Sequence, residues 1–177
     1  MTIELCDKSQ LRWVQPTSTR RAYQLRAENE VVGWLEFQKQ RGTLAIAEVQ
    51  GNSWTFKREG VLRPRITVRA AGSEKNIATF ELNWRGGGML QMADGPALHW
   101  DCANFWGSEW SFSLPNGAAL LRFRLEFGWM KPSARLLSLN REATVFPALD
   151  LLMALAWYLM VLAAEDMVGS TAIAAMG

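Results

Sequence analysis

The chain has 177 residues, of which 49% are hydrophobic and 20% are charged, and its formal net charge is +2. This composition is that of a globular protein with a sizeable core, and the length predicts a single domain. The one histidine and two cysteines, His99, Cys6 and Cys102, are too few and too scattered for a zinc site or a disulfide framework. The nearly balanced charge gives no reason to expect nucleic acid as a partner.

The first ten residues carry Glu4 and Asp7 where a signal peptide has bases, and they lack the apolar stretch that export requires. We therefore expect a cytoplasmic protein with reduced cysteines. Cys102 falls on the same side of an expected strand as Leu98 and Trp100, which predicts that it is a small buried hydrophobic residue.

From Leu11 to Leu139 the sequence consists of short runs rich in Val, Ile, Thr, Phe and Trp, separated by turn residues at roughly 8–12-residue intervals. The breaks fall at Arg41-Gly42, Gly51-Asn52, Gly60, Gly72-Ser73, Gly86-Gly87-Gly88, Asp94-Gly95-Pro96, Gly107 and Asn116-Gly117. Short turns between many consecutive strands predict a mainly antiparallel meander. Because open edges invite aggregation, we expect a closed β-barrel of about twelve strands.

Alternation within these runs predicts which side chains face the core. The clearest hairpin spans residues 110–127 around Asn116-Gly117. Its second strand carries Leu and Phe on one face and arginines and a glutamate on the other face. In residues 76–84 the predicted buried set is Ala78, Phe80, Leu82 and Trp84.

Residues 145–164 are apolar on every side, which predicts a central hydrophobic helix, capped by Thr144 and with Pro147 in its first turn. The length of about 30 Å suits either a barrel or a bilayer. Asp150 inside the segment and the scarcity of flanking bases favour a helix buried in the barrel, because a charge in a bilayer is costly. We expect one domain over residues 1–166, followed by a flexible tail at 167–177.

Four segments of the β-rich region, followed by one wholly apolar helix, carry a resemblance to a known family: Gly51–Arg58, Ala78–Phe80, Leu98–Trp100 and Asn104–Phe112. Together they resemble the tubby C-terminal-like superfamily, which includes the tubby, phospholipid scramblase and LURP-one-related proteins. The resemblance extends from about Leu11 to Asp166 and identifies the chain as a bacterial member. It implies a twelve-stranded antiparallel barrel threaded by the C-terminal helix. The tubby branch is associated with phosphoinositide head groups, whereas no stretch here resembles the calcium-binding segment of scramblases.

Five bases form the candidate site for a lipid or phosphate group: Lys57, Arg58, Arg63, Arg65 and Arg69. Three of them, Lys57, Arg65 and Arg69, are out of phase with their apolar neighbours, so we expect them on the barrel exterior. There they could bind phosphates by charge-assisted hydrogen bonds. The alternative is an ordinary solvated strand face.

Other candidates have simpler explanations. Gly86-Gly87-Gly88 lacks the Lys-Ser/Thr and helix of a phosphate-binding loop, and it is predicted as a turn. His99 and Asp101 share a strand face, but no nucleophile can be assigned to them. Most of the nine tryptophans are expected in the core, with Trp106 and Trp129 partly exposed.

These observations predict a non-enzymatic binding module for anionic phospholipid or phosphoinositide head groups, or for a protein partner, at the inner membrane surface. We expect no cofactor, no metal and no nucleic-acid partner. Two alternatives remain: a tail-anchored membrane protein with residues 145–164 in the bilayer, and a small hydrolase-like enzyme that uses His99 and Asp101.

Overall fold

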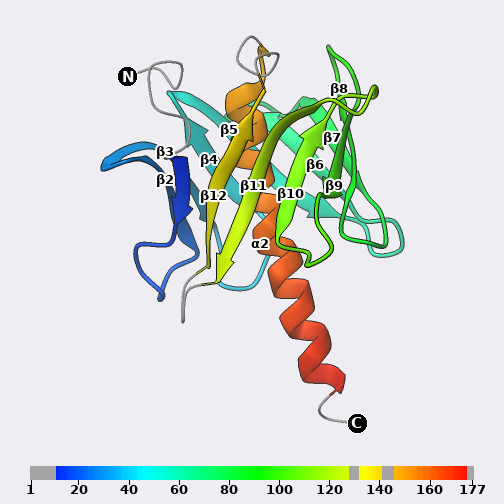
Figure 1. Ribbon diagram of the computed structural model, residues 1–177. Coiled ribbons are helices and arrows are strands. Elements are labelled where there is room, and N and C mark those ends of the chain that lie inside the picture. Colours follow the sequence, from blue (N-terminus) through cyan, green and yellow to red (C-terminus); the bar gives the residue numbers. More distant parts are fainter. Residues whose placement is uncertain (1–10, 128–131, 141–145, 175–177) are drawn as a thin grey trace.

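The structure is a computed structural model that describes residues 11–127, 132–140 and 146–174. Within these residues twelve antiparallel strands close into a barrel, and helix α2 (Leu149–Ala174) passes through it (Figure 1). The strands are β1 (Leu11–Val14), β2 (Ala22–Ala27), β3 (Glu30–Phe37), β4 (Ala45–Val49), β5 (Asn52–Glu59), β6 (Arg65–Ala70), β7 (Asn76–Leu82), β8 (Gly88–Met92), β9 (Leu98–Cys102), β10 (Glu109–Ser113), β11 (Ala119–Phe127) and β12 (Pro132–Leu139).

Each strand pairs with its neighbours in sequence, and β1 pairs with β12 to close the barrel. This confirms the predicted closed meander, which leaves no open sheet edge. In such a meander, successive loops alternate between the two ends of the barrel. Helix α2 begins at one end, which we call the entry end, and leaves through the other, which we call the exit end (Figure 1).

The core lies between the inner face of the barrel and helix α2. Inward-facing side chains alternate along the strands, as Trp54 and Phe56 do in β5. Apart from the half-buried Asp150, every residue of the helix from Leu149 to Leu162 is buried, because every direction from its axis meets the wall. Stacked rings join the two parts: Trp13 on Trp157, with centroids 5.9 Å apart, is one such pair. The predicted buried helix is thus confirmed.

The bounds of the helix differ from those expected. It begins at Leu149 instead of residue 145, and it continues to Ala174, through much of the segment predicted as a tail at 167–177. Residues 165–174 contain one glycine and no proline, so nothing in them ends the helix. The stretch Leu149–Val168 is long and apolar enough to cross a membrane, and 67% of its most apolar window is buried inside the barrel. The predicted cap Thr144 lies outside the described residues.

Two predicted core residues are exposed instead. Strand β7 ends at Leu82, and the Asn83 side chain accepts hydrogen bonds from the backbone of Arg85 and Gly87, at 2.9 and 3.1 Å. These bonds close a turn that holds Trp84 in solvent, with 86% of its surface exposed. Cys102 ends β9, is also exposed, and its thiol donates a hydrogen bond to the Asn104 carbonyl oxygen at 3.0 Å.

The tryptophans divide more evenly than expected. Four are buried and one, Trp110, is partly buried against the core; the buried ones are Trp13, Trp54, Trp100 and Trp157. Trp34, Trp84 and Trp106 are exposed, whereas Trp129 lies outside the described residues.

Candidate functional site

The loops at the exit end are basic. Five described loops lie there, namely residues 15–21, 38–44, 60–64, 83–87 and 103–108, and they contain no aspartate or glutamate. Their bases are Arg20, Arg21, Lys39, Arg41, Arg63 and Arg85. The described loops of the entry end have the opposite balance, with Glu28, Glu74 and Asp94 against Lys75. The barrel therefore carries a charge asymmetry along its axis.

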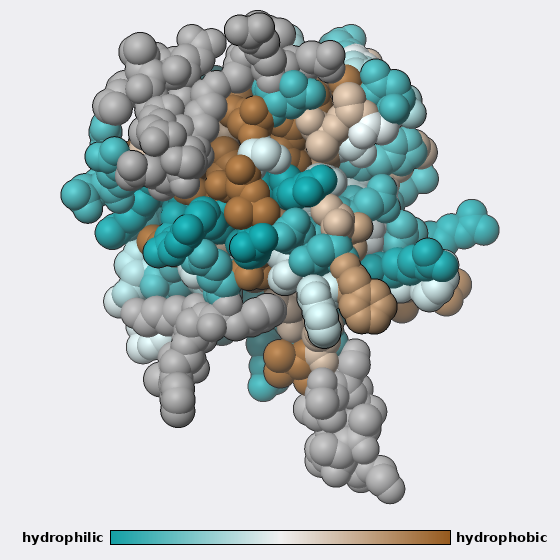
Figure 2. All heavy atoms as spheres, in the orientation of Figure 1, coloured by the Kyte–Doolittle hydropathy of each residue, from teal (hydrophilic) through white to brown (hydrophobic). Residues whose placement is uncertain are grey.

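The same exit-end loops expose large apolar side chains. Leu62 is 97% exposed and Phe105 is 93% exposed, and Val61, Trp84 and Trp106 are also mostly in solvent. Helix α2 protrudes beyond this end, and in Figure 2 hydrophobic atoms lie among hydrophilic ones where it leaves the barrel. Exposed apolar groups gathered beside polar ones are typical of surfaces that bind a partner or a membrane.

Two arginines hold the helix where it leaves the barrel. Arg21 Nη2 lies 2.6 Å from Glu165 Oε2, and Arg58 Nη1 lies 2.6 Å from Asp166 Oδ2. The hydrogen bond to Asp166 raises the pKa of Arg58 above its ordinary value. These two pairs neutralise Glu165 and Asp166, the acidic groups of the helix at the exit end.

Four loop bases remain unpaired. Arg20 pairs with Glu36 at 2.6 Å. In the part of the chain that the structure describes, the other four form no ion pair: Lys39, Arg41, Arg63 and Arg85. The Arg85 guanidinium lies over the exposed Trp84 ring, 4.5 Å from its centroid.

The structure does not bring the five predicted bases together. Lys57, Arg65 and Arg69 lie on the outer face, in register with Thr67, Glu59 and Thr55. Lys57 pairs with Glu59 at 3.3 Å. Three carboxylates next to these strands, Glu59, Glu74 and Glu81, match the three outer bases in number.

The contacts of the other predicted bases place them in different parts of the barrel. Arg69 forms an ion pair with Glu74 at 2.9 Å, near the entry end. Arg58 forms a structural pair with the helix, and Arg63 lies in the exit-end loop. The sequence-predicted patch is therefore dispersed, and only Arg63 and Arg65 face a common space.

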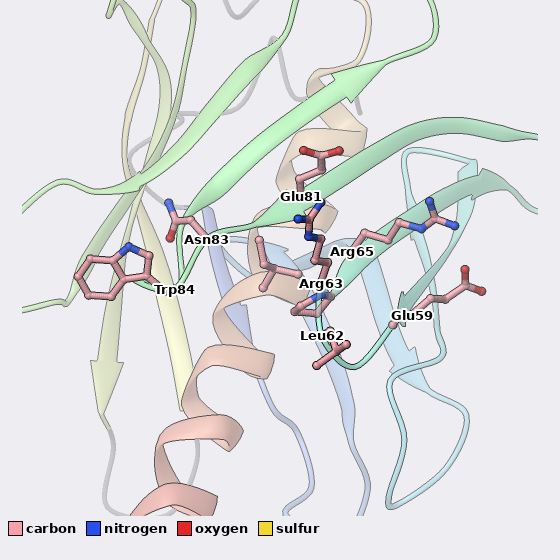
Figure 3. A pocket seen from close by; sticks show the side chains of 10 residues that line it. Glu59, Leu62, Arg63, Arg65, Glu81, Asn83 and Trp84 are labelled. Atoms are coloured by element: carbon pink, nitrogen blue, oxygen red, sulfur yellow. The ribbon is translucent and has the colours of Figure 1, made fainter.

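That space is a pocket of about 690 Å³ beside the exit end, between the 60–64 loop and the 83–87 turn. Its lining includes Glu59, Arg63, Arg65, Glu81 and Trp84, which Figure 3 shows arranged around it. Among the described residues, no carboxylate oxygen lies within 4 Å of a side-chain nitrogen of Arg63 or Arg65. The pocket thus holds bases available to an external ligand.

His99 and Asp101, the alternative catalytic pair, lie on an exposed strand face. His99 and Asp101 are exposed on β9, in register with Ser113 and Ser111 of β10. No hydrogen bond joins these four side chains within the described residues. In the same residues, no three of His, Cys, Asp and Glu are grouped as metal ligands.

Sequence reasoning missed the exit end as a site because it followed the charges along neighbouring strands. The signal was nevertheless present: once a meander is expected, every second loop belongs to the same end. Grouping alternate loops would have collected Lys39, Arg41, Arg63 and Arg85.

Comparisons with protein families, with curated proteins and with solved structures find no match to this chain.

Proposed function

We propose that this barrel is a non-enzymatic module that docks its exit end on an anionic phospholipid surface. The observation that carries the proposal is the composition of the exit-end loops, which contain bases, no acids and exposed large apolar side chains. The proposed setting is the cytoplasmic face of the inner membrane.

The bases and the exposed apolar side chains of the exit-end loops have different physical roles in this docking. A base close to an anionic leaflet contributes about 1 kcal/mol, and this attraction weakens with salt. Aromatic rings such as Trp84 and Trp106 favour the level of the head groups, where an apolar body meets water. The loop bases would bring the barrel to the membrane, and the apolar side chains would hold its exit end there.

We further propose that the chain is a divergent bacterial member of the tubby C-terminal-like superfamily. The twelve-stranded barrel threaded by a C-terminal helix agrees with the architecture that the resemblance implies. The proposed lipid surface is also consistent with the tubby branch, although the bases at the exit end are mostly not those expected from the sequence.

The proposal keeps helix α2 inside the barrel. Its residues from Leu149 to Leu162 supply about a third of the buried apolar residues, and a tail anchor would have to remove them from their packing with Trp13 and Phe37. The exposed and unlinked His99 and Asp101 provide no specific support for a hydrolase.

Flotation with lipid vesicles tests the proposal. The full chain is compared with a variant carrying Arg63→Glu and Arg85→Glu, and with a control carrying Arg26→Glu and Lys75→Glu. Both variants change the net charge equally, but the control residues lie toward the entry end. We expect wild type and control to float with phosphatidylglycerol vesicles at low salt and the exit-end variant to remain unbound.

The vesicle series adds phosphatidylcholine and phosphoinositide arms. Binding to phosphatidylglycerol and phosphoinositide, without binding to pure phosphatidylcholine, agrees with the proposal. Equal loss in both variants, or no binding to any anionic vesicle, contradicts it.

A further inference from the structure

The pocket beside the exit end contains unpaired charges of both signs. Arg63 and Arg65 supply guanidinium groups, and Glu81 supplies a carboxylate. Among the described residues none of these three side chains forms an ion pair, whereas Glu59 at the edge of the pocket is engaged by Lys57. Unpartnered charges of opposite sign around one space indicate a ligand that carries both charges itself.

The strand register fixes the relation between these charges. Arg65 of β6 lies directly opposite Glu81 of β7, so their Cβ atoms are about 5 Å apart on the outer face. Arg63 approaches the same space from the loop before β6, as Figure 3 shows. A ligand placed here would meet Arg63, Arg65 and Glu81, which all line the same pocket.

This arrangement disfavours a polyanion. A phosphoinositide head group with several phosphates would face Glu81 and Glu59, and like charges repel strongly where water is partly excluded. A single phosphate diester with an ammonium group nearby carries less negative charge, and its ammonium is attracted to a carboxylate. Its phosphate can accept from the arginines, while its ammonium donates to Glu81.

The margin of the pocket supplies an apolar lining. Leu62 and Trp84 border it and are among the most exposed apolar residues of the chain. Under the proposed docking, they would lie at the depth of head groups and upper acyl chains. A lipid head group is therefore the natural source of the ligand.

We propose that this pocket binds the phosphoethanolamine group of a phospholipid, with Arg63 and Arg65 on the phosphate and Glu81 on the primary ammonium. This inference rests on the proposed docking of the exit end for its lipid source. Phosphoethanolamine on a soluble compound shares the same chemistry, so the experiment has a membrane-free arm.

In the membrane-free arm, calorimetry measures binding of glycerophosphoethanolamine and of glycerophosphoglycerol, which lacks the ammonium. We expect wild type to bind the amine compound about tenfold more tightly, the usual effect of one charged hydrogen bond. Glu81→Gln should bring both compounds to equal affinity, and Arg65→Gln should weaken both about tenfold. Arg69→Gln, a base of the same strand already paired with Glu74, is the matched control and should behave as wild type.

In the vesicle arm, a fixed share of phosphatidylglycerol is mixed with either phosphatidylethanolamine or phosphatidylcholine. Wild type should bind the phosphatidylethanolamine mixture more tightly, and Glu81→Gln should remove that preference. A Lys39→Glu, Arg41→Glu variant, changed outside the pocket, should lose vesicle binding and retain the soluble ligand. Circular dichroism melting confirms that each variant is folded.

The outcomes separate the two proposals. Vesicle binding without any amine preference, or equal affinity of wild type for both soluble compounds, overturns the pocket inference and leaves the docking proposal standing. Binding of the soluble amine compound without vesicle binding overturns the docking proposal, and it assigns the pocket to a free phosphoethanolamine compound.

Discussion

Arg58 joins strand β5 to helix α2 by donating two hydrogen bonds to the Asp166 carboxylate, with Nη1 2.6 Å from Oδ2 and Nη2 3.2 Å from Oδ1. A bidentate pair of this kind fixes geometry as well as charge. The pair lies where the helix leaves the barrel, so Arg58 has a structural role at the exit end and holds the helix in place.

Replacing Arg58 by Gln should lower the free energy of unfolding by up to about 1 kcal/mol, because the pair is partly exposed and solvent screens it. Urea denaturation measures the change. Arg41→Gln, an unpaired base of the neighbouring loop, is the control and should have no measurable effect. If the two variants have the same stability, the Arg58–Asp166 pair does not stabilise the helix in the barrel.

Both tyrosines of the chain lie between the helix and the barrel, so their ionisation reports on that packing. Burial raises the pKa of Tyr23 to about 12, and it also raises the pKa of Tyr158, whose hydroxyl donates to the Thr43 carbonyl oxygen at 2.5 Å. The folded state retains these protons above pH 10, where the unfolded chain releases them, so stability should fall as pH rises through and above 10.

Ultraviolet absorbance of tyrosinate, followed together with circular dichroism, tests this expectation. We expect the tyrosinate signal to rise only well above pH 10, together with loss of structure. Ionisation of Tyr158 near pH 10 in a chain that is still folded would mean that its side chain is not enclosed by the barrel.

Asp150 lies in the first turn of α2 at the entry end, where the Asn52 side chain donates to its carboxylate at 3.3 Å. Burial raises the pKa of Asp150 above 3.8 in the folded state, and the Asn52 bond only partly opposes this. The stability contributed by the protonated carboxyl is therefore complete below pH 3.8 and is lost as pH rises through the raised pKa.

Asp150→Asn should remove this pH dependence and increase the free energy of unfolding at pH 7. Denaturation of wild type and variant at pH 3 and pH 7 measures it, with Asp94→Asn in an exposed turn as the control. A destabilised Asp150→Asn protein at pH 7 would contradict the assignment of burial as the dominant effect.

Gly88 begins β8 in close contact with the neighbouring strand. A Cβ atom there would lie 2.1 Å from the Glu81 carbonyl oxygen and 2.7 Å from the Phe80 ring. Gly88→Ala should therefore destabilise the barrel by about 3 kcal/mol, measured by urea denaturation.

Gly72→Ala is the matched control, because a Cβ at Gly72 meets nothing within 4 Å and only its positive φ is strained. It should cost about 1 kcal/mol. Equal costs at the two positions would contradict the described pairing of β7 with β8.

The architecture could be predicted from the sequence because local rules agree with one another. In the 110–127 hairpin, Gly117 has the positive φ that the turn requires, and Leu121 and Phe123 face the core as their alternation predicts. Residues 151–162 are apolar on every side of the helix, and they are buried on every side.

The errors arose where a polar side chain reorganises the backbone at a strand end. Alternation extended β7 to Trp84, but Asn83 closes a turn after Leu82. Asn104 acts similarly after Cys102, by accepting hydrogen bonds from the backbone of Ser108 and Glu109. A pattern of apolar residues does not contain these local hydrogen bonds.

The candidate site was less predictable because it depends on three-dimensional pairing. The sequence does not show that Arg58 meets Asp166, since that contact depends on the position of the helix along the barrel axis. It also does not show which outer bases have partners, which is what separates Arg65 from Lys57 and Arg69.

The orientation of the barrel on a membrane shows whether it docks by its exit end. With Cys6 and Cys102 replaced by Ser, an environment-sensitive nitrobenzoxadiazole label is attached at Phe105→Cys, at the exit end, or at Ala71→Cys, at the entry end. With phosphatidylglycerol vesicles, we expect brighter, blue-shifted emission from the label at position 105 and no change at position 71. Equal changes at both positions, or a change only at position 71, would contradict docking by the exit end.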